Sequence, residues 1–434
     1  MKILKNFRRA GGALAVLTAT TCLTVLGAST AHATNGNVQH GFGMGGKAMA
    51  GVGTALPQDT ANVMLNPAGM VYLGNRVDAG IAAFSPRRKV EANGGNIVNG
   101  IYNSDEELFL IPELGVNYML DEDTALSFTL TPSGGMNTEY AVNPFVGLNG
   151  TGLTDSTPAG VDLSQAFVSL TLSRKFGNHS FGISPVFAAQ KFKASGLQAF
   201  TGVSVANGHV TDNGYDHSYG GGFRVGYLGE WMDGLTVGAS YQSKMAMTKF
   251  TKYRGLFANA GEFDIPSMVN AGAAYKVPES KFTVGFDWQW ILYRDVEAIS
   301  NDGVMSLNSL AGAGEKRLGG SDHAPGFGWN DMHVFKLGAK YDYSPELTLR
   351  GGVSWNTGAY TDHDMLFNIL APATIRTHLT VGATYQMSEN HSVNFAYMHG
   401  LESSVSGTHV SNGTGTVKHT MSQHEAYVSY SYNW

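Results

Sequence analysis

The regular feature of this chain is an alternation of apolar and polar residues. Between Ala166 and Ser173, apolar residues occupy every even position, and the odd positions after Phe167 carry hydroxyl groups. The same period recurs in Phe282–Leu292, Phe335–Tyr343 and Leu379–Gln386. A period of two predicts a β-strand with one apolar and one polar face. Any single run would also suit a half-buried strand of a soluble sandwich.

The whole set of runs favours membrane-crossing strands over a soluble sandwich. Many runs exceed the roughly five to six residues usual in soluble sheets, and a tilted membrane strand needs about 9–11. Fourteen strands are expected, at 75–86, 108–119, 124–140, 163–176, 179–194, 215–230, 234–250, 263–277, 281–295, 331–343, 347–360, 374–387, 391–401 and 419–433.

The connections between these strands alternate in length. Short turns facing the periplasm and long external loops are typical of outer-membrane barrels, and an even strand count leaves both termini on the periplasmic side. The expected fold is therefore all-β, a 14-stranded antiparallel transmembrane β-barrel over residues 75–434. The long connections are 87–107, 141–162, 195–214, 251–262, 296–330, 361–373 and 402–418, whereas the short ones have two or three residues.

Composition agrees with a barrel in the membrane. Charged residues make up 14 % of the chain, against roughly 25 % in ordinary domains, while mean hydropathy is only −0.10. Strands that face lipid on one side and a polar lumen on the other average to this value. The net charge of −6 argues against nucleic acid as a partner.

Residues 1–33 are expected to be a signal peptide for export. A basic start that includes Lys2 and Arg9 precedes the uncharged run Ala13–Ala28, and Ala31-His32-Ala33 has the small-residue pattern of a cleavage site. An uncleaved anchor is the alternative. The only cysteine, Cys22, lies in this segment, so no disulfide is expected. No later apolar run reaches eighteen residues, so no transmembrane helix is expected.

The last residues have the pattern of a terminal barrel strand. Alternating apolar residues end in the aromatic Trp434. Such an ending, more often Phe, is typical of outer-membrane barrels, where the barrel assembly machinery recognises it. The expected location is the bacterial outer membrane, with membrane lipid and lipopolysaccharide as surroundings.

Residues 34–74 precede the first strand and show no alternation. They contain glycines and helix-compatible pieces, and Val63–Leu65 and Met70–Leu73 are too apolar for a solvated tail. Because about forty residues cannot form a core alone, they are expected to pack in the barrel lumen as a hatch. A disordered periplasmic tail is the alternative.

Two stretches of this segment resemble the FadL-type long-chain fatty acid transporters, a group that includes TodX-like aromatic hydrocarbon channels. One runs from Gly41-Phe42-Gly43 to Gly51-Val52-Gly53, and the other is Asp59–Gly69 with its Asn-Pro-Ala motif. The resemblance covers essentially the whole chain after the signal peptide. It implies a hatch that plugs the barrel.

The resemblance also implies a gated side opening. Asn66, Pro67 and Ala68 would lie against a kink in the third strand, where the wall opens. Pro132, Gly134 and Gly135 supply a plausible kink because proline lacks a ladder donor and glycine permits unusual dihedrals. An ordinary bulge near a loop is the alternative.

The function so implied is passive uptake of long-chain fatty acids or similar hydrophobic compounds, with lateral exit at the kink. No enzyme activity, cofactor or metal is expected. An apolar loop groove would collect the ligand, although the same side chains could instead close the barrel top. The candidate groove residues are Phe145, Leu148, Leu153, Leu197, Phe200 and Val203.

A carboxylate ligand would need a cation in the lumen. The candidates are Lys191, Arg224 and Arg350, with Lys336 and Lys340 as further possibilities. Each could instead pair with an acid such as Asp287 or Asp342. The histidines in the external loops match no metal-site spacing.

Three other functions compete with fatty acid uptake. A general diffusion porin would usually have sixteen or eighteen strands and an open lumen. A channel specific for aromatic or alkane hydrocarbons would suit the same apolar tunnel. An outer-membrane lipid hydrolase would need a Ser-His pair that no spacing singles out. An adhesin or phage-receptor role would leave no trace in the sequence, which also leaves the ligand and the oligomeric state open.

Overall fold

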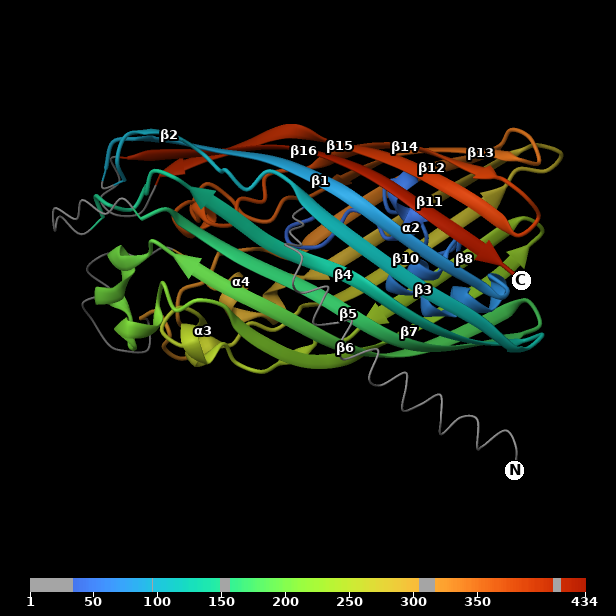
Figure 1. Ribbon diagram of the computed structural model, residues 1–434, viewed down its shortest axis with the longest axis horizontal. Helices are drawn as coiled ribbons and strands as arrows, with labels where there is room; N and C mark the ends of the chain where they lie inside the picture. The colour runs from blue at the N-terminus through green and yellow to red at the C-terminus, as the bar shows by residue number, and fades with distance from the viewer. Residues whose placement is uncertain (1–33, 96, 149–156, 304–316, 409–414) are drawn as a thin grey trace, which may run out of the picture.

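The computed structural model describes residues 34–95, 97–148, 157–303, 317–408 and 415–434. The expected signal peptide lies outside the described residues. Fourteen long antiparallel strands form a closed barrel, because β1 pairs with β3 on one edge and with β16 on the other (Figure 1). The expected fold class is confirmed, and each expected strand has a counterpart.

The barrel strands follow one another round the wall in chain order. They are β1 (Arg76–Asn93), β3 (Phe109–Asp121), β4 (Thr124–Tyr140), β5 (Ala159–Phe176), β6 (His179–Ser195), β7 (Asp216–Met232), β8 (Leu235–Gln242), β10 (Ser267–Lys276), β11 (Phe282–Leu292), β12 (Met332–Asp342), β13 (Leu347–Asn356), β14 (Thr377–Gln386), β15 (His391–Thr408) and β16 (Thr416–Asn433). Two short strands, β2 (Gly100–Asn103) and β9 (Ala246–Met247), pair with β1 and β7.

The strands are apolar outside and polar inside. On β5, Leu170 and Leu172 are exposed, whereas Ser169, Thr171 and Ser173 between them are buried. The same holds on the other strands, where exposed aromatic and aliphatic residues alternate with buried polar ones. This inverted burial is the arrangement that lipid outside and a filled polar lumen inside require.

The two ends of the barrel differ. Short turns gather at the end where the chain terminates, and the long connections gather at the other end (Figure 1). The backbone N–H of Trp434 donates to the carbonyl of Asn75 at 3.1 Å, so the start of β1 and the end of β16 lie together.

Several strand limits differ from the expected ones. The first strand and the last two extend further toward the loops than expected, whereas β8 and β10 are shorter. The added part of β15, residues 402–408, carries polar residues on both faces, so no alternation marked it. It is nevertheless a strand because it pairs with β16 as far as Thr408 and Thr416.

Residues 34–75 lie inside the barrel, where their short helices are drawn in blue (Figure 1). We call this segment the hatch. It contains α2 (Gly43–Ala48), η1 (Thr60–Met64) and η2 (Pro67–Tyr72), and nearly all its side chains before Tyr72 are buried. No helix among the described residues is long and apolar enough to cross a membrane.

The long connections fold over the other end of the barrel and bury the largest apolar cluster of the described residues, which we call the large external cluster. They carry the short helices η3 (Gln198–Val203), η4 (Asn207–His209), η5 (Thr251–Tyr253), α3 (Ala258–Gly261), η6 (Tyr293–Asp295), α4 (Glu297–Ser300) and η8 (Phe367–Ile369). Each of these helices except η4 has at least one buried residue.

A charge on the middle of the lipid face should destabilise the barrel. Leu337 is half exposed near the centre of β12. We expect Leu337→Arg to lower the free energy of unfolding by about 2–4 kcal/mol, and His333→Arg, closer to the loop end, by about 0–1 kcal/mol. Urea unfolding in liposomes measures both. Equal losses would contradict the assigned lipid face.

Candidate functional site

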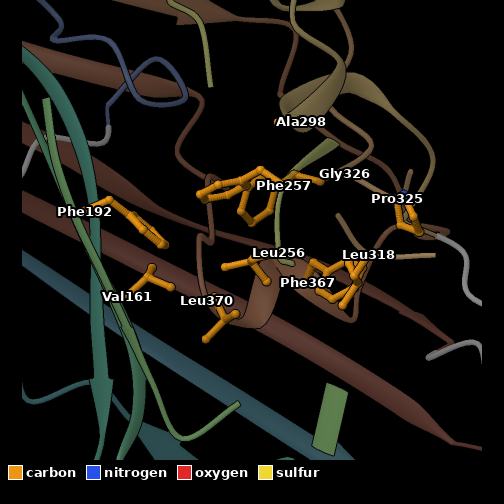
Figure 2. Close-up of a pocket in the computed structure, with 11 residues that line it drawn as sticks. Val161, Phe192, Leu256, Phe257, Ala298, Leu318, Pro325, Gly326, Phe367 and Leu370 are labelled. Carbon is orange, nitrogen blue, oxygen red and sulfur yellow. The ribbon is translucent and has the colours of Figure 1, made fainter. Parts of the chain in front are cut away.

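The loop end of the barrel holds a partly open apolar pocket with about 370 Å³ of space, some of which is continuous with solvent. Figure 2 shows the rings of Phe192, Phe257 and Phe367 directed toward a common space with aliphatic side chains between them. Its walls come from β5, β6 and three of the long connections. The lining residues are Val161, Phe192, Leu256, Phe257, Ala298, Leu318, Pro325, Gly326, Phe327, Phe367 and Leu370.

The groove residues proposed from the sequence lie beside this pocket and do not line it. They pack within the large external cluster, and the Phe200 ring contacts that of Phe367 at 5.5 Å. The expected exposed groove is therefore wrong for the described members, since they close the barrel top instead. Leu153 lies outside the described residues. The buried or half-buried members are Phe145, Leu148, Leu197, Phe200 and Val203.

The wall is interrupted at β4. The pairing of β4 with β5 shifts between Pro132 and Gly134, so Ser133 is an extra, bulged residue. The pairing of β4 with β3 ends at Leu130 and Leu114. From there to Glu139, whose carbonyl accepts from the N–H of Asp105, β4 has no strand partner on that side. The ladder gap therefore coincides with the kink that Pro132 and Gly134 were expected to form.

The start of the hatch covers this gap from inside. Val38 forms an antiparallel bridge with Gly134, and the Gln39 side chain donates to the carbonyl of Pro132. A Cβ on Gly134 would lie 1.9 Å from the carbonyl oxygen of Asn37, so only glycine permits this approach. The hatch thus supplies partners for backbone groups that β3 leaves unpaired.

The Asn-Pro-Ala motif lies elsewhere. Asn66 donates to the carbonyls of Thr54 and Tyr227 at 2.8 and 2.9 Å and accepts from the N–H of Ala68 at 3.0 Å. The carbonyl of Ala68 accepts from Ser173 and Ser180. The motif is therefore the first turn of η2, anchored on β5, β6 and β7. Its expected contact with the kink is wrong, because Asn66 caps a helix while the residues nearer the N-terminus reach β4.

Lumen-facing glycines let the hatch approach the wall. A Cβ on Gly352 would lie 2.6 Å from the carbonyl carbon of Met49, and one on Gly226 would lie 2.0 Å from Asn66 Oδ1. Side chains at these positions would displace the hatch backbone. Close docking of the hatch therefore explains part of the high glycine content.

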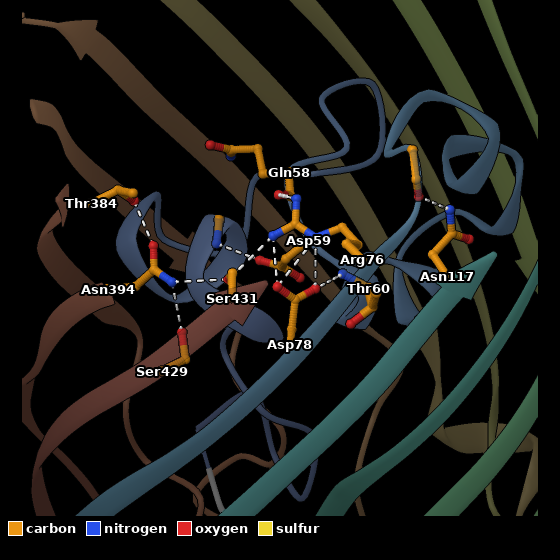
Figure 3. Close-up of polar contacts among 12 residues, drawn as sticks. Gln58, Asp59, Thr60, Arg76, Asp78, Asn117, Thr384, Asn394, Ser429 and Ser431 are labelled. Carbon is orange, nitrogen blue, oxygen red and sulfur yellow. Dashed lines mark hydrogen bonds and ion pairs between the residues drawn. The ribbon is translucent and has the colours of Figure 1, made fainter. Parts of the chain in front are cut away.

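Polar groups of the wall bind the hatch backbone. The Asp287 carboxylate accepts from the N–H groups of Gly53 and Thr54 at 2.9 and 2.8 Å. On β1, Asp78 accepts from the N–H of Thr60 and pairs with Arg76 at 2.6 Å (Figure 3). These contacts meet the requirement that buried backbone groups have partners.

Two hatch side chains carry buried charge. Lys47 contacts Glu425 at 2.8 Å and Glu113 at 4.0 Å. Burial by itself would lower the pKa of Lys47, but these two carboxylates raise it above the ordinary value. Burial and the nearby Asp78 carboxylate raise the pKa of Asp59 to about 6. The hatch is therefore joined to β3 and β16 by a buried ion pair.

Arg224 has a different environment from the other lumen cations. Its side chain is 1 % exposed, its Nε donates to Gln242 at 2.9 Å, and its Nη1 donates to Ser169 at 3.2 Å. Nη2 is buried without a hydrogen-bond partner, and no ion pair of the described residues includes Arg224. An apolar cluster that includes Phe167 adjoins it, 5.3 Å from ring centroid to guanidinium. A buried cation of this kind suits an anionic ligand.

The other candidate cations have different positions or partners. Arg350 donates to Gln58 and Thr384, and Lys336 donates to the carbonyl of Gly51. Lys340 lies 3.4 Å from Asp342, so pairing with an acid is its observed state.

Lys191 is not a lumen residue. It shares the face of β6 with exposed Ile183 and Phe187, and its ammonium lies over the Tyr215 ring at 4.9 Å. The expected lumen position is therefore wrong, because a shift of one residue along a strand changes the face.

The structure also identifies residues that the sequence did not single out. Tyr293 and Trp329 are buried at the junction of the hatch and the loops, yet each occurs in a stretch without a distinguishing motif. Among the described residues, no group of three or more His, Cys, Asp or Glu side chains could hold a metal ion.

Comparisons with known proteins agree with this architecture. The family model for outer membrane protein transport proteins (OMPP1/FadL/TodX) matches residues 22–433. A 47 kDa outer membrane protein of Pasteurella multocida is 24 % identical over 205 residues, and the match spans 42 % of this chain and 43 % of that protein.

Solved structures show the same fold. The toluene transporter TodX of P. putida has a TM-score of 0.70 and 20 % identity over 91 % of this chain and 99 % of its own. A FadL homologue of Pseudomonas aeruginosa has a TM-score of 0.66 and 15 % identity over 92 % and 99 %. The toluene transporter TbuX of Ralstonia pickettii has a TM-score of 0.62 and 19 % identity over 91 % and 99 %.

A methyl group on the lumen face of β13 should loosen the hatch. We expect Gly352→Ala to lower the free energy of unfolding by about 1–3 kcal/mol, because the added methyl group would overpack against Met49. We also expect the variant to show transient ion conductance in planar bilayers. Gly351→Ala is the matched control, because its Cβ would meet only the carbonyl of Thr380 at 3.5 Å. Equal conductance of both variants would show that the hatch does not depend on this contact.

Proposed function

Because the chain belongs to the OMPP1/FadL/TodX family of outer-membrane transport proteins, we propose that it takes up long-chain fatty acids by passive diffusion. The family consists of transport channels for hydrophobic compounds and not of enzymes. The proposal adds the class of ligand and the route of exit.

The route begins at the external pocket. Removing a methylene group from water into an apolar site is favourable by about 0.8 kcal/mol, so an acyl chain would partition into the Phe192 and Phe257 side of the pocket. The large external cluster continues from there to Val38 and Met136 at the β4 gap. A ligand following it would avoid the aqueous phase.

Arg224 is the observation that favours a carboxylate. A buried cation without a counter-ion is costly unless a ligand supplies the charge. The unpartnered Nη2 offers a donor, and the adjoining cluster with Phe167 and Val186 suits an acyl chain. A neutral hydrocarbon would leave that donor unused.

Exit would occur through the ladder gap. Val38 and Gln39 cover backbone groups of β4 between Pro132 and Gly134, so displacing the start of the hatch would expose the space between β3 and β4 to lipid. The Asn66-Pro67-Ala68 motif would then act as the fixed anchor about which this part moves.

A hydrocarbon channel is the second candidate. Two of the similar structures are toluene transporters, and the external pocket is lined almost wholly by carbon. In that case Arg224 would play no part in uptake. Comparing labelled oleate with toluene in a transporter-null host separates the two candidates.

Removing the charge of Arg224 should reduce the uptake of carboxylic acids and leave the uptake of neutral hydrocarbons unchanged. We expect Arg224→Met to weaken oleate uptake about 10–100-fold, since hydrogen bonds to charged groups contribute about 1.5–3 kcal/mol, and to leave toluene uptake unchanged. Arg350→Met serves as the matched control because Arg350 already binds Gln58 and Thr384. Unchanged oleate uptake by Arg224→Met would remove the carboxylate site.

Closing the gap should stop exit. Deletion of Ser133 removes the extra residue of the bulge and lets β4 pair regularly with β5. We expect a folded barrel with oleate uptake reduced at least about tenfold, because the edge that faces β3 would be restored. Whole-cell uptake measures this, and wild-type rates in the deletion variant would exclude lateral exit at β4.

Loss of the anchor should release the hatch. Deleting Asn66-Pro67-Ala68 removes the bonds to Tyr227, Ser173 and Ser180. We expect ion leakage together with altered uptake of oleate and toluene. Equal uptake by the deletion variant and the intact protein would exclude a role of this motif in gating.

A further inference from the structure

The turn at residues 35–38, where the hatch begins, is held by several contacts, among them a hydrogen bond of 3.0 Å from the Asn356 amide to Asn35 Oδ1. On one side, Val38 bridges to Gly134 in the bulge of β4. The Tyr293 hydroxyl also holds it, donating to the carbonyl of Asn35 at 2.6 Å and accepting from the N–H of Asn37 at 3.2 Å. The position of Tyr293 therefore helps to decide whether this turn covers the gap.

Tyr293 is in turn positioned by Trp329. Their rings meet edge to face with centroids 5.1 Å apart, and both residues are buried. Trp329 Nε1 donates to Asn368 Oδ1 at 2.7 Å. The Asn368 amide donates to the carbonyls of Phe327 and Asp364 at 2.7 and 2.6 Å. The orientation of the indole ring thus depends on two loop backbones.

The same two loops form part of the external pocket. Phe327 and Phe367, which flank this network, both line it. Leu370 lines it as well, and its carbonyl accepts from Thr138 of β4 at 2.7 Å. A continuous set of contacts therefore runs from the pocket wall through Asn368 and Trp329 to Tyr293.

We propose that Tyr293 is a positioning residue that couples occupancy of the external pocket to release of the hatch turn from β4. The inference rests on the proposed passage of an apolar ligand and adds its regulation. A ligand in the pocket displaces the rings of Phe327 and Phe367, and the shift reaches Trp329 through Asn368.

The physical basis is close packing and differential binding. Densely packed side chains transmit a displacement because they have no free space to absorb it. A ligand shifts the hatch only if it binds better when Phe327 and Phe367 have moved. The Tyr293 hydroxyl then loses its alignment with Asn35 and Asn37, and Val38 separates from Gly134.

Thiol labelling of the hatch turn tests the proposal in the full-length protein. Cys22 is the only cysteine of the chain, so Val38→Cys in a Cys22→Ser background gives a single thiol beside the gap. A polar maleimide reports its accessibility, and the apolar dye N-phenyl-1-naphthylamine serves as the pocket probe. We expect slow labelling that the dye accelerates about 5–150-fold, the usual range of allosteric coupling.

Tyr293→Phe keeps the ring contact with Trp329 and removes the hydroxyl. We expect this variant to label rapidly without dye and to respond little to it. Tyr253→Phe is the matched control, since that buried hydroxyl bonds to Ala194 and Gly214 and not to the hatch. Labelling of Tyr293→Phe at the control rate, with normal acceleration by dye, would overturn the proposal.

A second variant keeps the test decisive if Tyr293→Phe does not fold. Trp329→Phe removes the bond to Asn368, so we expect slow labelling that the dye no longer accelerates while dye fluorescence still reports binding. If the dye accelerates labelling of this variant as it does in the wild type, coupling through Asn368 and Trp329 is contradicted. Oleate uptake by the wild type separates the two proposals. If the wild type does not take up oleate, the proposed ligand is wrong. If it takes up oleate normally but the dye does not accelerate labelling, only the proposed role of Tyr293 is wrong.

Discussion

The rest of the structure depends on satisfying the backbone polar groups of a segment buried inside the barrel. The hatch has little regular structure of its own, so its N–H and carbonyl groups need partners from the wall. Asp287, Asp78 and Thr380 supply them, with Thr380 both accepting from Ala50 and donating to Ala48. These contacts come from different sides of the barrel, and together they hold the hatch at the centre.

At the gap in the wall the roles are exchanged, because here the hatch supplies partners for backbone groups of the wall. In lipid, an unpaired strand edge is costly, and closed barrels normally avoid it. Here β4 leaves its partner β3 at Leu130, and Val38 and Gln39 of the hatch take over part of the pairing. The seal is therefore made by a segment separate from the two flanking strands, of which β3 keeps its pairing with β1 and β4 its pairing with β5.

Charge is distributed unevenly through the lumen. Lys47 and Arg76 have carboxylate partners, and Lys336 donates to a hatch carbonyl. These groups hold the hatch. Arg224 has no acidic partner among the described residues and adjoins an apolar cluster that includes Phe42 of the hatch. The cations that contact the hatch thus have carboxylate or carbonyl partners, whereas Arg224 is bound by the neutral side chains of Gln242 and Ser169.

The sequence by itself determined the barrel, because a strand period of two is a local property of the chain. Contact with lipid requires apolar residues at the outward positions, such as those from Ala166 to Leu172. It also located the kink, since Pro132 and Gly134 carry local conformational constraints. It misplaced Asn66-Pro67-Ala68, Lys191 and the loop residues around Phe200. Only the tertiary structure decided those positions, together with the burial of Tyr293 and Trp329 beside the hatch. The face of Lys191 depends on the register of β6, and the other positions depend on contacts between segments distant along the chain, which leave no period in the sequence.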